Sequence, residues 1–322
     1  GWGVGLTVNV GEAAGAAATG IEAAVTQQLE SEKYRETSEY KSFLDQAGGN
    51  VAKAEALIYA EAKSLILGDS RSMQGIQPSV INKYFKTSDF ELPIMNYSFT
   101  IAQIAYGPLY LESIKKKLDQ NTTNGLFIIT VNPWILSERE NDDLENGVFF
   151  EKGMPPHNMK FVNLNPNFEY VIKNFNYFHF RSIISRTSKM HKDGWLEESN
   201  LPKDTVMLNL WKQKQIALYS DYSSKWKKSN FRLNGLEELI KYLDSFGYVV
   251  LLRMPIDEKI ISIENKFWNN FDVDIKEVAL KTNVKYLNLS HDNKYTTYDG
   301  NHLDKYGGVV FTKELCDSII YK

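Results

Sequence analysis

The sequence predicts an α/β protein built around a mainly parallel five-stranded sheet that is wound on both faces by helices. Five short apolar segments have the length of strands, and segments with the apolar spacing of helices lie between them. One of the five is a continuous, β-branched run, which is typical of a buried parallel strand. The predicted strands are residues 65–67, 92–98, 126–131, 248–252 and 284–289.

The composition of the 322-residue chain argues against several other classes of protein. Its formal net charge of −3 gives no electrostatic footprint for nucleic acid. No run of about 18 apolar residues predicts a membrane span. Cys316 is the only cysteine, which excludes an intrachain disulfide and a multi-cysteine metal site, and the histidines show no metal-ligand spacing. We therefore expect a globular protein with no metal and no cofactor.

Residues 1–62 differ in composition from the rest of the chain. The first 60 residues hold four basic and eight acidic side chains, and helix formers dominate residues 21–45 and about 50–62. We interpret residues 1–62 as an Ala-rich helical arm, which is either a surface tether or expression remnant, or a docking segment for a protein partner. Residues 63–322 are then the α/β domain, with an insertion at about residues 135–232.

The first predicted strand leads into a turn that contains a serine. Gly68-Asp69-Ser70 follows the strand, and a helical pattern continues from about Pro78 to Tyr84. At the carboxyl edge of a parallel sheet, such a turn presents a serine hydroxyl beside backbone N–H groups that favour an anion. Ser70 is therefore a candidate nucleophile, and the alternative is an ordinary turn residue.

The insertion after the third strand is dense in aromatic residues. Such residues either stack on sugar rings and line an acyl pocket, or form the core of an appended subdomain. Helices are predicted beyond it at residues 236–246, 264–280 and about 305–320. Arg253 ends the fourth strand and Arg71 follows the serine, so each is a candidate to bind an anionic substrate group, with a structural ion pair as the alternative.

A second polar motif precedes the last predicted helix. Asp299 and His302 are three residues apart in a polar loop. A carboxylate at this spacing can hold an imidazole through Nδ1–H while Nε2 takes a serine proton, which is the division of labour in a serine triad. The alternative for His302 is a solvent-exposed loop residue.

Together, G-D-S after the first strand and D-x-x-H before the last helix resemble the SGNH hydrolase (GDSL esterase/lipase) superfamily. The resemblance covers about residues 63–322, apart from the insertion. It implies a flavodoxin-like three-layer α/β/α sandwich, with Ser70 as nucleophile, His302 as general base and Asp299 as its orienting residue. It also favours an extracytoplasmic location, although residues 1–20 carry no positive charge and do not resemble a signal peptide.

The family has two further sequence blocks that supply oxyanion donors, and this chain departs from both. In the loop after the second strand it has no glycine before Gly107, so a backbone N–H near Phe99 would have to serve. Asn132 stands where the family's G-x-N-D asparagine would lie, without the flanking Gly and Asp. The alternative interpretation of Asn132 is a turn residue before Pro133. The backbone N–H of Ser70 would complete the oxyanion site.

The expected function is that of a serine esterase or O-acyltransferase that acts on an acylated small molecule or, above all, on an O-acyl or O-acetyl group of a carbohydrate. The alternative is a catalytically weak or inactive SGNH-like module of a surface or secretion assembly. The two altered blocks favour that alternative, and the intact Ser70, Asp299 and His302 argue against it. A nucleotide-binding flavodoxin-like protein is a third interpretation, but a phosphate-binding Gly-rich loop is missing.

Overall fold

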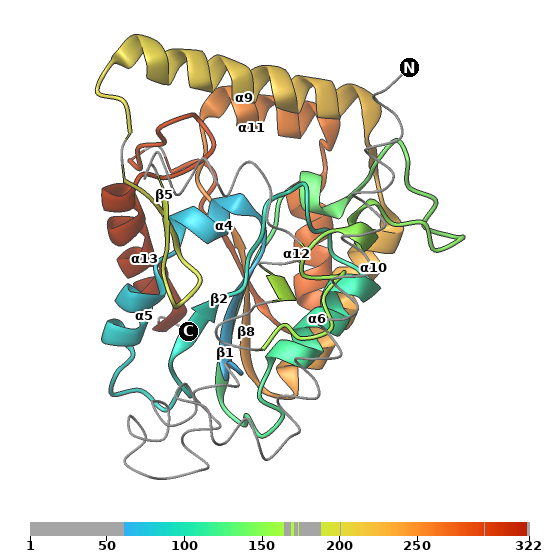
Figure 1. Ribbon diagram of the computed structural model, residues 1–322, viewed down its shortest axis with the longest axis vertical. Helices are drawn as coiled ribbons and strands as arrows, with labels where there is room; N and C mark the ends of the chain where they lie inside the picture. Colours follow the sequence, from blue (N-terminus) through green and yellow to red (C-terminus); the bar gives the residue numbers. More distant parts are fainter. Residues whose placement is uncertain are drawn as a thin grey trace, which may run out of the picture. The chain divides into compact units, whose positions relative to one another are not determined.

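The computed structural model describes residues 61–163, 169–170, 173, 188–199, 201–292 and 294–320 (Figure 1). The chain separates into two compact units, residues 1–61 with 159–180 and residues 62–158 with 181–322. All the helices and strands given below belong to the second unit. Apart from its last two residues, the predicted arm at 1–62 lies outside the described residues.

A five-stranded, wholly parallel sheet forms the centre of the second unit. Its strands are β1 (Ser64–Leu67), β2 (Ile94–Asn96), β3 (Gly125–Thr130), β8 (Gly247–Arg253) and β9 (Lys285–Asn288). They lie in the order β2-β1-β3-β8-β9, and every neighbouring pair is parallel. This is the flavodoxin-like strand order, so the predicted fold class is confirmed. Winding reverses between β1 and β3, and ligands of such sheets bind beyond the carboxyl ends of the strands at that point.

Helices cover both faces of this sheet (Figure 1). One face carries α5 (Pro78–Tyr84) and α13 (Lys305–Ile320), with the short α4 (Ser70–Gly75) beside them. The other carries α6 (Pro108–Lys117), α10 (Asn230–Asp244) and α12 (Phe271–Thr282). Helices α9 (Thr205–Lys225) and α11 (Glu258–Phe267) lie side by side across the end of the unit where α4 begins. None of the described helices is long and apolar enough to cross a membrane.

The remaining elements are short. They are β4 (Ser137–Glu138) paired with β7 (Lys227–Lys228), β5 (Ser188–Met190) paired with β6 (Leu196–Glu198), and the 3-10 turns η2 (Trp134–Leu136) and η3 (Phe150–Gly153).

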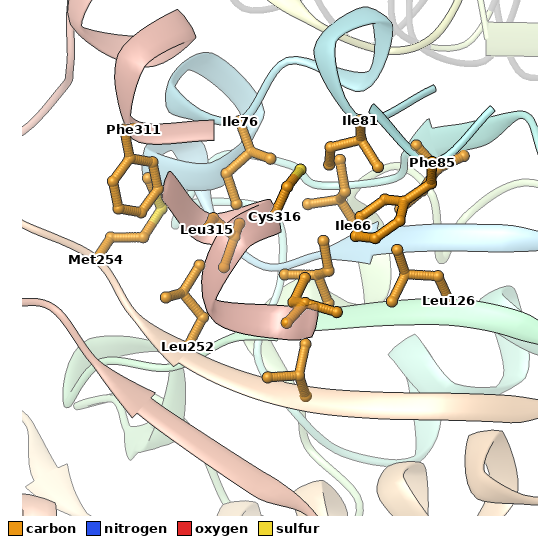
Figure 2. Close-up of a cluster of buried hydrophobic side chains, with 14 of the residues drawn as sticks. Ile66, Ile76, Ile81, Phe85, Leu126, Leu252, Met254, Phe311, Leu315 and Cys316 are labelled. Carbon is orange, nitrogen blue, oxygen red and sulfur yellow. The ribbon is translucent and has the colours of Figure 1, made fainter. Parts of the chain in front are cut away.

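The sheet face toward α13 is closed by a cluster of buried apolar side chains (Figure 2). Ile66, Leu126 and Leu252 contribute from three neighbouring strands, and Phe311 and Cys316 contribute from α13. The lone cysteine is thus a packing residue, and burial raises the pKa of its thiol to about 12. Cys316 is therefore a neutral thiol at physiological pH and not a thiolate nucleophile.

The structure corrects two of the predicted helices. The segment predicted as one helix at 264–280 is two, because α11 ends at Phe267 and α12 begins at Phe271. Asn269 and Asn270 lie between them, and asparagine side chains compete with the helical backbone. The helix predicted from residue 236 begins earlier, at Asn230, where Ser229 caps it by accepting a hydrogen bond from the N–H of Arg232.

Candidate active site

The turn after β1 places Ser70 at the carboxyl edge of the sheet, beside the reversal point. Gly68 has a φ of +149°, and a Cβ atom there would lie 1.7 Å from Oγ1 of Thr130, so only glycine fits. Asp69 caps α4 by accepting a hydrogen bond from the N–H of Arg71 at 3.0 Å. Ser70 is half-buried at the first position of α4, where no carbonyl of the helix can accept its N–H.

The loop before α13 brings Asp299 and His302 to this serine. Nε2 of His302 is 2.8 Å from Oγ of Ser70, and Nδ1 is 2.8 Å from Oδ2 of Asp299. The other carboxylate oxygen of Asp299 accepts the backbone N–H groups of Asn301 and His302 at 2.9 and 2.8 Å. Gly300 has a φ of +84°, which lets the loop fold back around the carboxylate. Three residues from the two ends of the domain thus form one hydrogen-bonded series.

The environment of Asp299 keeps its carboxylate ionised. Burial alone would raise the pKa of Asp299, but the electrostatic interaction with His302 and the hydrogen bonds from His302 and Asn301 lower the pKa below its ordinary value. An ionised carboxylate only accepts hydrogen bonds, so Nδ1 of His302 carries a proton. When the ring is neutral, Nε2 therefore presents a lone pair to the hydroxyl of Ser70, which is the arrangement that a general base requires.

Two further side chains complete the surroundings of this loop, and no motif in the sequence marked them. The ring of Tyr298 stacks on the imidazole of His302 with 5.8 Å between centroids, and its hydroxyl donates to Gln74 of α4 at 2.7 Å. Gln215 of α9 donates a hydrogen bond to Oδ2 of Asp299 at 3.3 Å. The insertion therefore reaches the site through α9.

The predicted oxyanion donor at Phe99 is wrong. The N–H of Phe99 donates to the carbonyl of Gly68 at 3.1 Å, and the N–H of Thr100 donates to Oε1 of Gln103 at 3.0 Å. The reason is that the loop after β2 continues the hydrogen bonding to β1 past the end of β2. The N–H of Tyr97, the first residue after β2, donates to the carbonyl of Ile66 in the same way. These N–H groups are satisfied within the protein, so the loop offers none of them to a substrate.

Asn132 holds the serine turn from the neighbouring strand. Its Nδ2 donates to Oδ2 of Asp69 at 2.7 Å, and its Oδ1 accepts the N–H of Trp134 at 3.0 Å. The contact with the N–H of Trp134 is typical of a turn residue at the start of η2, which is the alternative role considered for Asn132. A side-chain amide has two N–H donors, and Asp69 uses one of them.

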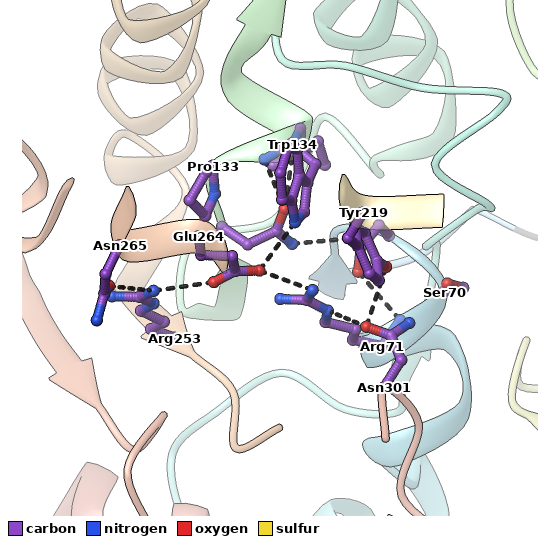
Figure 3. A network of polar contacts seen from close by, with 12 residues as sticks. Ser70, Arg71, Pro133, Trp134, Tyr219, Arg253, Glu264, Asn265 and Asn301 are labelled. Atoms are coloured by element: carbon purple, nitrogen blue, oxygen red, sulfur yellow. Dashed lines mark hydrogen bonds and ion pairs between the residues drawn. The ribbon is translucent and has the colours of Figure 1, made fainter. Parts of the chain in front are cut away.

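The two arginines that were candidates for substrate binding are buried and paired with carboxylates (Figure 3). Nη2 of Arg71 lies 2.7 Å from Oε1 of Glu264, and Nη2 of Arg253 lies 2.9 Å from Oε2 of the same residue. Arg253 also pairs with Asp272 at 2.8 Å. Burial would lower the pKa of Arg71, but the charge of Glu264 raises it above its ordinary value. These positions contradict a direct role in substrate binding and match the alternative, a structural ion pair.

The fold and the site define an α/β protein that carries a serine–histidine–aspartate arrangement at the carboxyl edge of a parallel sheet. Among the described residues, no group of three or more His, Cys, Asp or Glu side chains could hold a metal ion. No family model matches the sequence, and no curated protein is significantly similar to it.

Several solved structures show a distant likeness to the chain. A protein from Streptococcus pneumonia described as a platelet activating factor is 14% identical, with a TM-score of 0.37, and the match covers 94% of this chain and 99% of that one. An extracellular lipase from Streptomyces rimosus is 11% identical, with a TM-score of 0.33, and the match covers 79% of this chain and 98% of the lipase. At these scores the chemistry of the site has to be inferred from its own geometry.

Proposed function

We propose that this protein is a serine esterase or O-acyltransferase of the SGNH type. In this proposal Ser70 is the nucleophile, His302 is the general base and Asp299 orients the imidazole. The observation that carries the proposal is the pair of 2.8 Å contacts that His302 makes, through Nε2 to Ser70 and through Nδ1 to Asp299. Nucleophile, base and orienting group lie within hydrogen-bond reach of one another in the order that acyl transfer needs.

The reaction follows from these contacts. Oγ of Ser70 attacks the ester carbonyl carbon while its proton passes to Nε2 of His302. When the tetrahedral intermediate collapses, the C–O bond to the leaving alcohol breaks and the alcohol oxygen takes the proton from Nε2. Water or a sugar hydroxyl then attacks the acyl carbon while its proton passes to Nε2 of His302. The bond between the acyl carbon and Oγ of Ser70 breaks and Oγ takes that proton, which gives hydrolysis with water or acyl transfer with the sugar.

The oxyanion would be stabilised by the backbone N–H of Ser70 and by the second N–H of the Asn132 amide. The N–H of Phe99 is already bonded to Gly68, so it is left out of the proposed site. Because a single oxyanion donor contributes about 3 kcal/mol to transition-state stabilisation, a site with one donor fewer is expected to turn over slowly.

An O-acylated carbohydrate is the substrate class we propose. Trp211 of α9 and Tyr298 form an edge-to-face pair with 6.2 Å between centroids, and Tyr298 in turn stacks on His302. Both aromatic rings are partly exposed, so they offer an apolar surface next to the triad on which a sugar ring can stack. The family resemblance points to the same class of ester.

Hydrolysis of p-nitrophenyl acetate tests the proposal. We expect turnover by the unmodified protein, a loss of roughly a thousandfold or more in Ser70→Ala, and unchanged turnover in the control Ser224→Ala, which alters an exposed serine of α9. A fluorophosphonate probe should label the protein but not Ser70→Ala. Equal rates of p-nitrophenyl acetate hydrolysis by the unmodified protein and by Ser70→Ala would contradict the proposal that Ser70 is the nucleophile of an enzyme.

The occupied N–H groups of Phe99 and Thr100 favour one other candidate, a weakly active or inactive SGNH-like module that works through contacts with a partner. The N-terminal residues 1–62 are the segment proposed for that contact. Absence of both hydrolysis and fluorophosphonate labelling would support this second function over the first.

A further inference from the structure

The side chain of Asn301 connects the proposed base to the buried ion pairs. Its Nδ2 lies 3.1 Å from Nε2 of His302, the same nitrogen that faces Ser70. Its Oδ1 accepts hydrogen bonds from Nε–H of Arg71 at 2.8 Å and from the hydroxyl of Tyr219 at 3.0 Å. Figure 3 shows Asn301 held between Arg71 and Tyr219, and all three residues are buried.

The contact with Arg71 fixes the orientation of the side-chain amide of Asn301. A guanidinium group only donates hydrogen bonds, so the atom of Asn301 that faces Nε of Arg71 must be the oxygen. The reverse orientation would set two N–H groups against each other in the protein interior, where an unsatisfied donor is costly. Arg71 is itself fixed by its ion pair with Glu264. The amide nitrogen therefore faces His302, where it can only donate.

We propose that Asn301 is a positioning residue for the base, and that its Nδ2–H donates to Nε2 of neutral His302 and so fixes the ring with Nε2 facing Ser70. The inference rests on the proposed function of the triad. Asp299 requires the same tautomer from the opposite edge of the ring, because its carboxylate accepts Nδ1–H. The imidazole is thus held at both nitrogens, and the single lone pair of Nε2 is shared between the amide N–H of Asn301 and the hydroxyl of Ser70.

The same contact acts on the protonated intermediate. Once Nε2 has taken the proton of Ser70, an N–H of His302 faces an N–H of Asn301, and the contact becomes unfavourable. Asn301 therefore discourages storage of the proton on His302 and favours its onward transfer to the leaving-group oxygen. The positive charge of Arg71 acts in the same sense. Asp299 and Glu198 of β6, which both interact electrostatically with His302, act in the opposite sense.

The variant Asn301→Asp tests this role at nearly constant size. One carboxylate oxygen can keep the contacts to Arg71 and Tyr219, while the other replaces the donor that faces Nε2. We expect the protonation midpoint of His302, followed by NMR and assigned with His302→Gln, to rise by about one pH unit or more. The acidic limb of the plot of kcat against pH should move to higher pH by the same amount as the midpoint, with KM unchanged. A midpoint equal to that of the unmodified protein would overturn the proposal.

A second variant keeps the test decisive if Asn301→Asp does not fold. Tyr219→Phe removes one donor to Oδ1 of Asn301 but keeps the ring that stacks on Trp134. We expect kcat to fall roughly fivefold at constant KM, while Tyr222→Phe, one turn further along the same aromatic cluster, leaves kcat unchanged. Equal kcat values for the two variants would count against Asn301. If the unmodified protein hydrolyses no ester, the proposed function fails, whereas the NMR midpoint still decides the role of Asn301.

Discussion

At the scale of single residues, the carboxylate of Asp299 shows how the surroundings of one side chain set its charge. Burial raises the pKa of Asp299, but the interactions with His302 and with two backbone N–H groups lower it by more, so the net pKa of Asp299 is lowered. A carboxyl group whose pKa is lower in the folded than in the unfolded protein stabilises the fold above its unfolded pKa. That stabilisation disappears as the pH falls through the folded pKa.

Asp299→Asn should therefore affect both activity and the pH dependence of stability. We expect kcat to fall by roughly 10³- to 10⁴-fold, because an amide can no longer enforce the Nδ1–H tautomer. The free energy of unfolding, measured in urea, should be lower than that of the unmodified protein at pH 5 to 7, and the difference should shrink as the pH falls below about 4. Asp204→Asn, which exchanges one good N-cap of α9 for another, is the control. A difference that stays constant from pH 6 to pH 3 would contradict this account.

The sequence could predict which three residues meet at the candidate site, but not the side chains that support them. Ser70, Asp299 and His302 lie in short local motifs, so their chemistry is legible without a structure. Asn301 stands inside the second motif, yet its role depends on Arg71, 230 positions away in the chain, and a contact of that kind leaves no local pattern. The prediction of an oxyanion donor at Phe99 is wrong because the sequence does not show which backbone N–H groups donate to a neighbouring strand.

At the scale of elements, the alternation of strands and helices was predictable because buried parallel strands are continuous apolar runs. Helix α9 was not predicted. Few of its side chains are buried, and those that contact the site, such as Gln215 and Tyr219, are polar. A helix without a clear apolar stripe gives a weak periodic signal. The boundary between α11 and α12 is not evident from the sequence for the opposite reason, since both helices have apolar residues at helical spacing.

The turn between β1 and α4 is the element on which the site depends most. In Gly68→Ala, the new methyl group would overlap the hydroxyl of Thr130 and also meet Oγ of Ser72 at 2.6 Å. We expect the free energy of unfolding to fall by about 3 kcal/mol, together with a loss of the proposed esterase activity because Ser70 moves. Gly153→Ala, where a Cβ would meet nothing within 4 Å, should change stability by less than about 0.5 kcal/mol. Similar unfolding midpoints for the two variants would show that the turn tolerates a side chain.

At the scale of the whole domain, one buried carboxylate joins segments that are far apart in sequence. Glu264 of α11 pairs with Arg71 at the start of α4 and with Arg253 at the end of β8, and it accepts a hydrogen bond from the indole N–H of Trp134 at 2.9 Å. Glu264 is fully buried, so the two guanidinium groups depend on it for charge balance. The sequence marks each arginine by its place at a strand end, but it does not show that one glutamate serves both.

Glu264→Gln tests how far the domain relies on this cluster. An uncharged amide would leave Arg71 without its carboxylate and Arg253 with Asp272 alone. Because breaking a buried ion pair leaves an uncompensated charge, we expect the free energy of unfolding in urea to fall by about 3 to 5 kcal/mol. Asp221→Asn, which breaks an exposed pair with Lys225 on α9, should leave the unfolding midpoint in urea almost unchanged. The folded fraction of Glu264→Gln should also lose kcat, since Arg71 then no longer fixes the amide of Asn301. Stability within about 1 kcal/mol of the unmodified protein would mean that the arginines find other partners, and that the cluster does not hold the site in place.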